Sequence, residues 1–125
     1  MEPITSKSEL RLKVLLDKVL PNEEYMDNYR PDWLKNPETG CNLELDRFYP
    51  NLKIGIEFNG TQHRKKNNEL QWNRDRTKKH LCAKHGVIRL VFYANELNEQ
   101  TVISKLKDVS DMRNCWQQGL VWSKQ

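Results

Sequence analysis

The chain lacks long apolar runs. None of its segments approaches the ~18 consecutive apolar residues that a membrane-spanning helix needs. Its first residues, MEPITSKSEL, lack the basic-then-apolar pattern of a signal peptide, so we expect an intracellular protein that makes no use of a membrane. Cysteine is also scarce. The three present, Cys41, Cys82 and Cys115, are odd in number and far apart, which disfavours a disulfide framework or a zinc site and favours reduced thiols.

The length and composition indicate one folded unit. A chain of 125 residues suits a single domain spanning 1–125, large enough to bury a core. Hydrophobic residues make up 37% and charged residues 30%, a balance typical of a globular protein and not of a disordered one.

Positive charge is concentrated in one segment. Residues 1–63 hold 8 basic and 11 acidic side chains, whereas residues 64–89 hold 9 basic and 2 acidic ones. Such a cluster is expected where a protein binds a polyanion such as nucleic acid, although a solvated helix face carries similar charge without any partner.

A helix is predicted from about residue 7 to Leu20. Ser6 and Glu9 have the spacing of a capping box, and a proline follows the segment. Leu12 and Leu16 share one face with Glu9 at helical spacing, so Glu9 lies at the end of a stripe that faces the core.

The later segments predict strands alternating with helices. The stretch after the first helix predicts a short strand or extended arm and a turn at NPETG. Two strands around a tight turn follow in LELDRFYPNLKIGIEFNGTQH (43–63), then a basic loop over 61–68. A helix over 69–85 ends at Gly86. The run VIRLVFY (87–93) predicts an interior strand covered on both faces, and the tail predicts one helix, with or without a second short element.

The predicted order is therefore α-β-β-β-α-β-α. It indicates an α/β (α+β) domain in which a small mixed β-sheet is flanked by helices.

Each strand of the hairpin carries a carboxylate, Asp46 or Glu57, among apolar residues. With the turn centred on Asn51 and Leu52, Asp46 lies directly opposite Glu57, and opposed residues of an antiparallel pair point to the same face. Like charges so placed are destabilising, and a buried unpaired carboxylate costs several kcal/mol. The pair therefore needs a compensating charge.

A divalent cation is the simplest compensation. Mg²⁺ prefers oxygen ligands and is usually held by one or two carboxylates together with water and substrate phosphate. The alternative is an ion pair with Arg47 or Lys53. Strand alternation places Arg47 on the opposite face from Asp46, and Lys53 lies near the turn, so the pattern favours the metal.

The segment EFNGTQH adds polar groups just past the second strand. Gly60 allows the chain to turn or a ligand to approach closely, and Asn59, Gln62 and His63 surround it. A histidine near two carboxylates can act as a general acid or base near neutral pH, although a surface histidine after a glycine turn is also common.

These residues resemble a known family. A Glu in the first helix, an Asp in one hairpin strand and IE followed by NGTQH resemble the PD-(D/E)XK nuclease superfamily, and within it the very-short-patch-repair and EDxHD homing endonucleases. RDRTKKHLCAKHGVIRLVFY resembles the helix and strand that follow in those domains. The resemblance covers about residues 6–93 and implies a restriction-endonuclease-like core.

The resemblance also implies a metal site. Asp46 and Glu57 would ligate Mg²⁺ (or Mn²⁺), with the Phe58 carbonyl as a third ligand. Glu9 would approach the same ion from the first helix, or else serve only the capping box.

One position departs from the family pattern. The motif lysine should stand at position 59, where this chain has Asn59. Gln62, His63 or Lys78 can take over the role of orienting the attacking water, and His63 is the first choice because it can also transfer a proton. Asp75 would hold Lys78 or His63 in place, or form only an exposed helix ion pair.

Together these features predict a Mg²⁺-dependent DNA endonuclease. Six basic residues would contact phosphates: Arg64, Lys65, Lys66, Arg74, Arg76 and Lys79. The chain shows no separate recognition module, so we expect structure-selective or weakly specific cleavage, or specificity supplied by a homodimer or a partner. Two alternatives remain open: a non-catalytic nucleic-acid-binding domain on the same fold, and a structural or regulatory protein whose carboxylates merely pair with basic side chains.

Overall fold

The computed structural model of the chain describes residues 7–60 and 69–118. The described elements are α1 (Lys7–Val19), β1 (Met26–Tyr29), β2 (Leu45–Tyr49), β3 (Ile54–Asn59), α2 (Glu69–Lys84), β4 (Ile88–Tyr93), the short 3₁₀ helix η1 (Ala94–Glu96) and α3 (Glu99–Gln118). The predicted order and the mixed α/β class are confirmed, and η1 is an addition. None of the described helices is long and apolar enough to cross a membrane.

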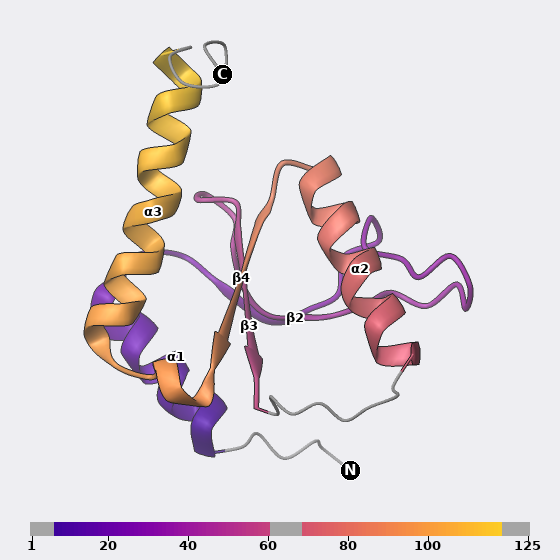
Figure 1. The fold of residues 1–125 in the computed structure, drawn as a ribbon, viewed down its shortest axis with the longest axis horizontal. Coiled ribbons are helices and arrows are strands. Elements are labelled where there is room, and N and C mark those ends of the chain that lie inside the picture. Colours follow the sequence, from indigo (N-terminus) through magenta and orange to yellow (C-terminus); the bar gives the residue numbers. More distant parts are fainter. Residues whose placement is uncertain (1–6, 61–68, 119–125) are drawn as a thin grey trace.

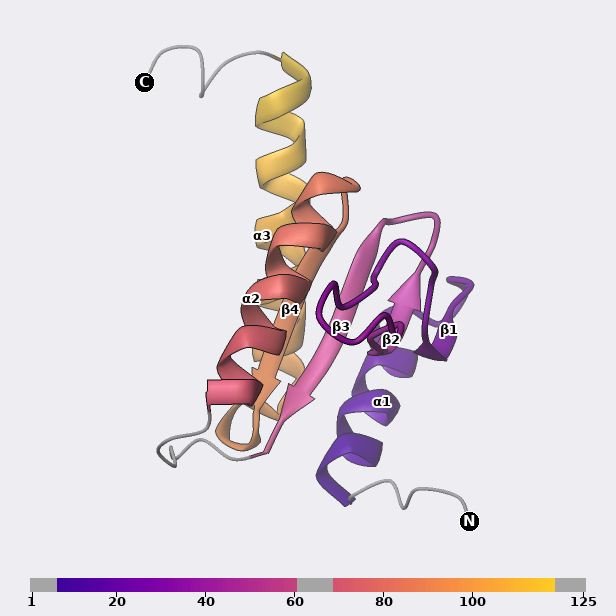
Figure 2. The same cartoon turned by 90° about the vertical axis from the view of Figure 1, so that its right-hand side faces the viewer.

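A four-stranded mixed sheet lies between helices. Its order is β1-β2-β3-β4, with antiparallel pairing from β1 to β3 and parallel pairing between β3 and β4. The parallel pair requires a crossover connection, which contains α2. Figure 1 shows α2 on one face of the sheet and α1 with α3 on the other. In Figure 2 α3 continues well beyond the end of the sheet.

The prediction for the strand VIRLVFY is only partly right. Helices cover both of its faces, which explains its near-continuous apolar sequence. It is not an interior strand, however, because β4 stands at the edge of the described sheet and pairs only with β3 there. Coverage of the two faces and position in the sheet are separate properties, and the apolar pattern reports only the first.

The core has two parts, one on each face of the sheet. The larger packs α1 and α3 against the strands through Leu12, Leu16, Tyr49, Ile56, Phe92, Val102 and other buried residues. The smaller lies beneath α2 and contains Leu34, Leu45, Phe48, Cys82 and Val87. Two separate apolar layers therefore fix the sheet between its helices, and polar groups at the sheet surface must lie at their margins.

The end of α2 follows the predicted glycine signal. Gly86 has φ +73°, and the N–H of Val87 donates to the carbonyl of Cys82 at 2.8 Å. This is the Schellman pattern, in which a left-handed residue after the helix allows the last carbonyls to find donors. This motif ends α2 and turns the chain into β4, which begins at Ile88.

After η1, the described part of the tail forms one continuous helix, α3. Asn98 caps α3, because its Oδ1 accepts from the N–H of Thr101 at 2.8 Å. Further along, the guanidinium of Arg113 donates to the carbonyls of Leu52 and Lys53. α3 thus binds the hairpin turn directly.

Candidate functional site

The register of the acidic hairpin is the predicted one. Phe48 pairs with Gly55, and the same register carried toward the start of β2 sets Asp46 opposite Glu57. Asp46 Oδ2 accepts a hydrogen bond from the Phe58 N–H at 2.8 Å. The charge of Glu57 is close enough to raise the pKa of Asp46, although it is only one of several causes of that rise. The two carboxylates therefore lie near each other on the α2 side of the sheet.

Glu57 is a buried carboxylate with two cationic partners. Only 8% of the surface of Glu57 is exposed to solvent. Lys78 Nζ, from α2, lies 2.8 Å from Oε1, and Arg89 Nε, from β4, lies 2.5 Å from Oε2. Arg89 also reaches Asp75 at 3.3 Å. Both oxygens of Glu57 are thus engaged, and its negative charge is compensated within the described structure.

Asp46 is compensated much less completely. The described residues give it the Phe58 N–H and no ion pair within 4.0 Å. Burial raises the pKa of its carboxyl to about 6, the Phe58 hydrogen bond lowers it, the charges of Glu9 and Glu57 raise it further, and Lys78 lowers it. The rise dominates because desolvation penalises the ionised form.

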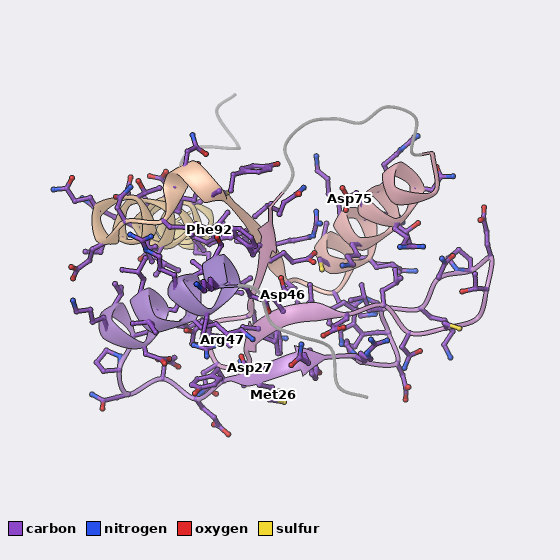
Figure 3. All side chains as sticks on the ribbon, turned by 90° about the horizontal axis from the view of Figure 1, so that it is seen from below. Met26, Asp27, Asp46, Arg47, Asp75 and Phe92 are labelled. Carbon is purple, nitrogen blue, oxygen red and sulfur yellow. The ribbon has the colours of Figure 1, made fainter. Side chains whose placement is uncertain are left out.

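The other face of β2 carries a different charge cluster. Arg47 is 2% exposed and donates to Asp27 at 2.6 Å and to Asp17 at 2.8 Å. Its guanidinium also lies 3.7 Å from the ring centroid of Tyr25. In Figure 3 Asp46 lies between Asp75 on one side and Arg47 with Asp27 on the other. The prediction that Arg47 points away from Asp46 is confirmed.

Glu9 approaches the acidic pair from α1. Its charge contributes to the raised pKa of Asp46, and its carboxylate lies 3.3 Å from Lys13 Nζ. Lys13 in turn lies 3.8 Å from Asp27. This chain of charges links the two sides of β2. Ser6, the partner in the predicted capping box, lies outside the described residues, so that role of Glu9 stays a prediction.

Among the candidates for the missing motif lysine, Lys78 is the one that the structure describes. It contacts Glu57 directly, as given above, and its charge acts on Asp46. Asn59 lies at the end of β3, level with Tyr93 of β4. Five predicted residues lie outside the described part of the chain: Gln62, His63, Arg64, Lys65 and Lys66.

The basic residues of α2 that were predicted as site residues divide into two sets. Lys78 faces the sheet and the acids, whereas Arg74, Arg76 and Lys79 are exposed. The role of the exposed set in binding phosphates stays a prediction.

One member of the site, Arg89, was not among the predicted residues. Arg89 is the single charge in the run VIRLVFY, and only the parallel pairing of β4 with β3 brings it to Glu57. Asp75 contacts Arg89, whereas the sequence suggested Lys78 or His63 as its partner. A lone arginine in an otherwise apolar strand is a signal in itself, because such a charge needs a buried partner.

The donor set fits a metal site of two carboxylates, on one condition. Within residues 7–60 and 69–118, no three Asp, Glu, His or Cys side chains lie close enough together to hold one ion. Asp46 and Glu57 supply two carboxylates, a number that suffices for Mg²⁺ when water and phosphate complete the coordination. Because both oxygens of Glu57 accept from cations, binding there requires Lys78 or Arg89 to move away.

The chain is similar to two viral proteins. Uncharacterized protein 033L of Invertebrate iridescent virus 3 is 41% identical over 68 residues, which are 47% of this chain and 35% of that protein. Uncharacterized protein 307L of Invertebrate iridescent virus 6 is 41% identical over 80 residues, 53% of this chain and 41% of that protein. The matched segment thus spans less than half of each relative. No protein family matches the chain, and no solved structure does.

Proposed function

We propose that this chain is a divalent-metal-dependent endonuclease that hydrolyses phosphodiester bonds in DNA. The observation that carries the proposal is the convergence of Asp46, Glu57 and Lys78 on one face of the sheet. A carboxylate pair with an adjacent ammonium group offers ligands for a hard cation and a positive charge for a phosphate.

The arrangement of elements supports the same proposal. An antiparallel hairpin, a helix and a strand parallel to the second hairpin strand are the parts that the resemblance to PD-(D/E)XK nucleases implies. We therefore propose a restriction-endonuclease-like core for this domain.

The residues of the site have separable roles in this proposal. Asp46 and Glu57 would hold Mg²⁺ or Mn²⁺, which when bound polarises a phosphate and lowers the pKa of its water. The hydrogen bond from Phe58 to Asp46 fixes the peptide next to Glu57, so that the Phe58 carbonyl is a further ligand candidate. Glu9 would approach the same ion from α1.

Lys78 has the position to replace the missing motif lysine. On release from Glu57 its ammonium group can orient the attacking water and stabilise negative charge on the phosphate. Arg89, held by Asp75, remains to position Glu57. Proton transfer by His63, with Gln62 orienting the water, stays part of the proposal on sequence grounds alone.

The expected partner is DNA, and the expected location is inside the cell, where such a substrate lies. The exposed Arg74, Arg76 and Lys79 would track phosphates without reading bases. Specificity would then come from the shape of the DNA, from a second copy of the chain or from a partner.

A second candidate is a non-catalytic nucleic-acid-binding domain on the same fold. One observation favours it: Glu57 is already neutralised by Lys78 and Arg89, a closed arrangement that is stable without metal. Asn59 in place of the motif lysine is consistent with a lost activity.

A cleavage assay separates the two candidates. Purified protein is incubated with plasmid, branched DNA and RNA in the presence of Mg²⁺, Mn²⁺ or EDTA. We expect metal-dependent cleavage of DNA that Asp46→Ala reduces by roughly two to three orders of magnitude, because a metal ligand acts on the transition state. DNA binding in EDTA should be retained by this variant.

The matched control is Asp108→Ala, which removes an exposed carboxylate from α3 on the other face of the sheet. It should cleave like the unmodified protein. Absence of metal-dependent cleavage on every substrate, with binding intact, would favour the non-catalytic candidate.

A further inference from the structure

A groove runs between the loop of residues 35–39 and the outer side of α2. It is open to solvent along one side and has a volume of about 770 Å³. Its walls combine apolar area, to which Pro37 and Leu81 contribute, with basic and polar side chains. Lys35 lies on the loop side, Arg74 and Arg76 lie on the helix side, and all three are exposed.

The groove also carries neutral hydrogen-bonding groups. Thr39 Oγ1 accepts from the Cys41 N–H at 3.2 Å, and Asn36 Oδ1 accepts from the Glu38 N–H at 2.9 Å. Each bond uses an oxygen of the side chain and leaves its donor hydrogens outside that bond. Thr77 and His80 add donors from α2. The cations, hydroxyls and amides among the lining residues are groups that proteins use to bind phosphate oxygens.

The loop wall is built before any ligand arrives. A bridge joins Lys35 to Asn42, and the Asn36 N–H donates to the Cys41 carbonyl at 2.9 Å. Next to the loop, Trp33 stacks on His85 with ring centroids 4.8 Å apart, which ties this segment to the end of α2. A preformed wall needs little ordering on binding and therefore favours affinity.

We infer that this groove binds the sugar–phosphate backbone of one nucleic-acid strand, a choice of ligand that rests on the proposed function. Thr77 lines the groove and its neighbour Lys78 contacts Glu57, so the groove and the acidic pair lie on adjoining sides of the same helical turn. A strand held in the groove is thereby brought beside Asp46 and Glu57. The loop of residues 35–39, which was predicted only as a turn, is thus part of the binding surface.

The inference predicts that changing Glu38 and changing a cation of the groove affect DNA affinity in opposite directions. Glu38 is the acidic side chain among the described residues of the lining. Its carboxylate repels phosphate, so Glu38→Gln should tighten binding while the loss of a cation weakens it. If the loop had only a structural role, removing the acid and removing a cation would not change the DNA affinity in opposite directions.

The test is fluorescence anisotropy of a labelled 30-base-pair duplex in EDTA, across a range of salt. Lys35→Ala combined with Arg74→Ala should weaken binding by at least about tenfold and reduce the slope of log K against log salt by roughly 2. Glu38→Gln should strengthen binding about two- to fivefold at low salt. The control pair is Arg11→Ala with Lys107→Ala, which removes the same charge from α1 and α3 on the opposite face.

Each outcome decides a different question. Equal losses in the groove pair and the control pair would overturn the inference, since non-specific charge would then explain binding. Unchanged or weaker binding by Glu38→Gln would also overturn it, and so would the absence of any binding. If the groove variants behave as expected but no substrate is cleaved with metal, the groove stands and the proposed nuclease activity fails.

Discussion

Two neighbouring residues of β2, Arg47 and Asp46, bury their charges in different ways. Arg47 is almost fully buried and has two aspartates and a tyrosine ring as partners. Asp46 is partly buried, has one backbone donor among the described residues and has a pKa raised to about 6. The first charge is matched on its face of the sheet, and the second lies where its ionised form is disfavoured.

The difference separates a structural role from a functional one. A well-paired buried charge fixes the way in which elements meet, as Arg47 does between β1, β2 and α1. A carboxylate whose surroundings disfavour its charge lowers stability at neutral pH, and such residues are concentrated at functional sites. The comparison therefore gives Arg47 a packing role and supports the chemical role proposed for Asp46.

The largest expected effect on stability is at Arg47. Arg47→Met removes the partner of Asp17 and Asp27 and the contact with Tyr25, so the free energy of unfolding should fall by about 3 kcal/mol. The two aspartates are partly exposed and can turn toward water, which keeps the loss at the lower end for a broken buried pair. Urea denaturation followed by tryptophan fluorescence measures it.

Arg30→Met is the matched control, because the ion pair of Arg30 with Glu44 is exposed on the arginine side. It should cost less than about 1 kcal/mol. Similar losses in the two variants would break the comparison, since Arg47 would then contribute no more than a surface arginine.

The sequence predicted most of the fold because its signals are local. The proline after α1, the glycine after α2 and the alternation in the hairpin each act within a few residues, and the element order predicted from them is correct. The prediction that β4 is an interior strand was wrong, because β4 stands at the edge of the described sheet. Its apolar sequence reflects the helices on both faces, whereas its place in the sheet depends on pairing between distant segments.

The acidic pair was predictable for the same reason, since a tight hairpin fixes its own register. The cations around it were only half predictable. Lys78 followed from the helix resemblance, but Arg89 reaches Glu57 across 32 positions of sequence through a parallel pairing that no local pattern specifies. A single sequence does not predict which charged side chains a crossover connection brings together.

A smaller effect, of opposite sign, is expected at Asp46. Folding raises the pKa of its carboxyl from the ordinary 3.8 to about 6. Between these pH values the folded protein binds more protons than the unfolded chain, so stability falls as pH rises, and above pH 6 the full cost is present. Asp46→Asn keeps an oxygen for the Phe58 N–H and removes this cost.

Metal-free Asp46→Asn should therefore be more stable than the unmodified protein by about 2 kcal/mol at pH 8, a figure reduced for the partial exposure of the site. The gain should shrink through pH 6 and vanish below about pH 3.8. Denaturation midpoints in EDTA across this range give the profile. A variant less stable than the unmodified protein at pH 8 would place Asp46 with Arg47 as a structural charge.

The smallest expected effect is the stabilisation by metal, and it links the two properties of Asp46. At Mg²⁺ about ten times the dissociation constant, binding to the folded state alone adds about 1.4 kcal/mol to the free energy of unfolding. Because the ligand must be deprotonated, a proton competes below the Asp46 pKa of about 6. The same Mg²⁺ concentration at pH 5 should then add only about 0.4 kcal/mol. Thermal denaturation with Mg²⁺ or EDTA at pH 8 and pH 5 measures both values. Asp46→Asn should lose the response while Asp108→Asn keeps it, whereas an equal response in both variants would mean that the ion binds elsewhere.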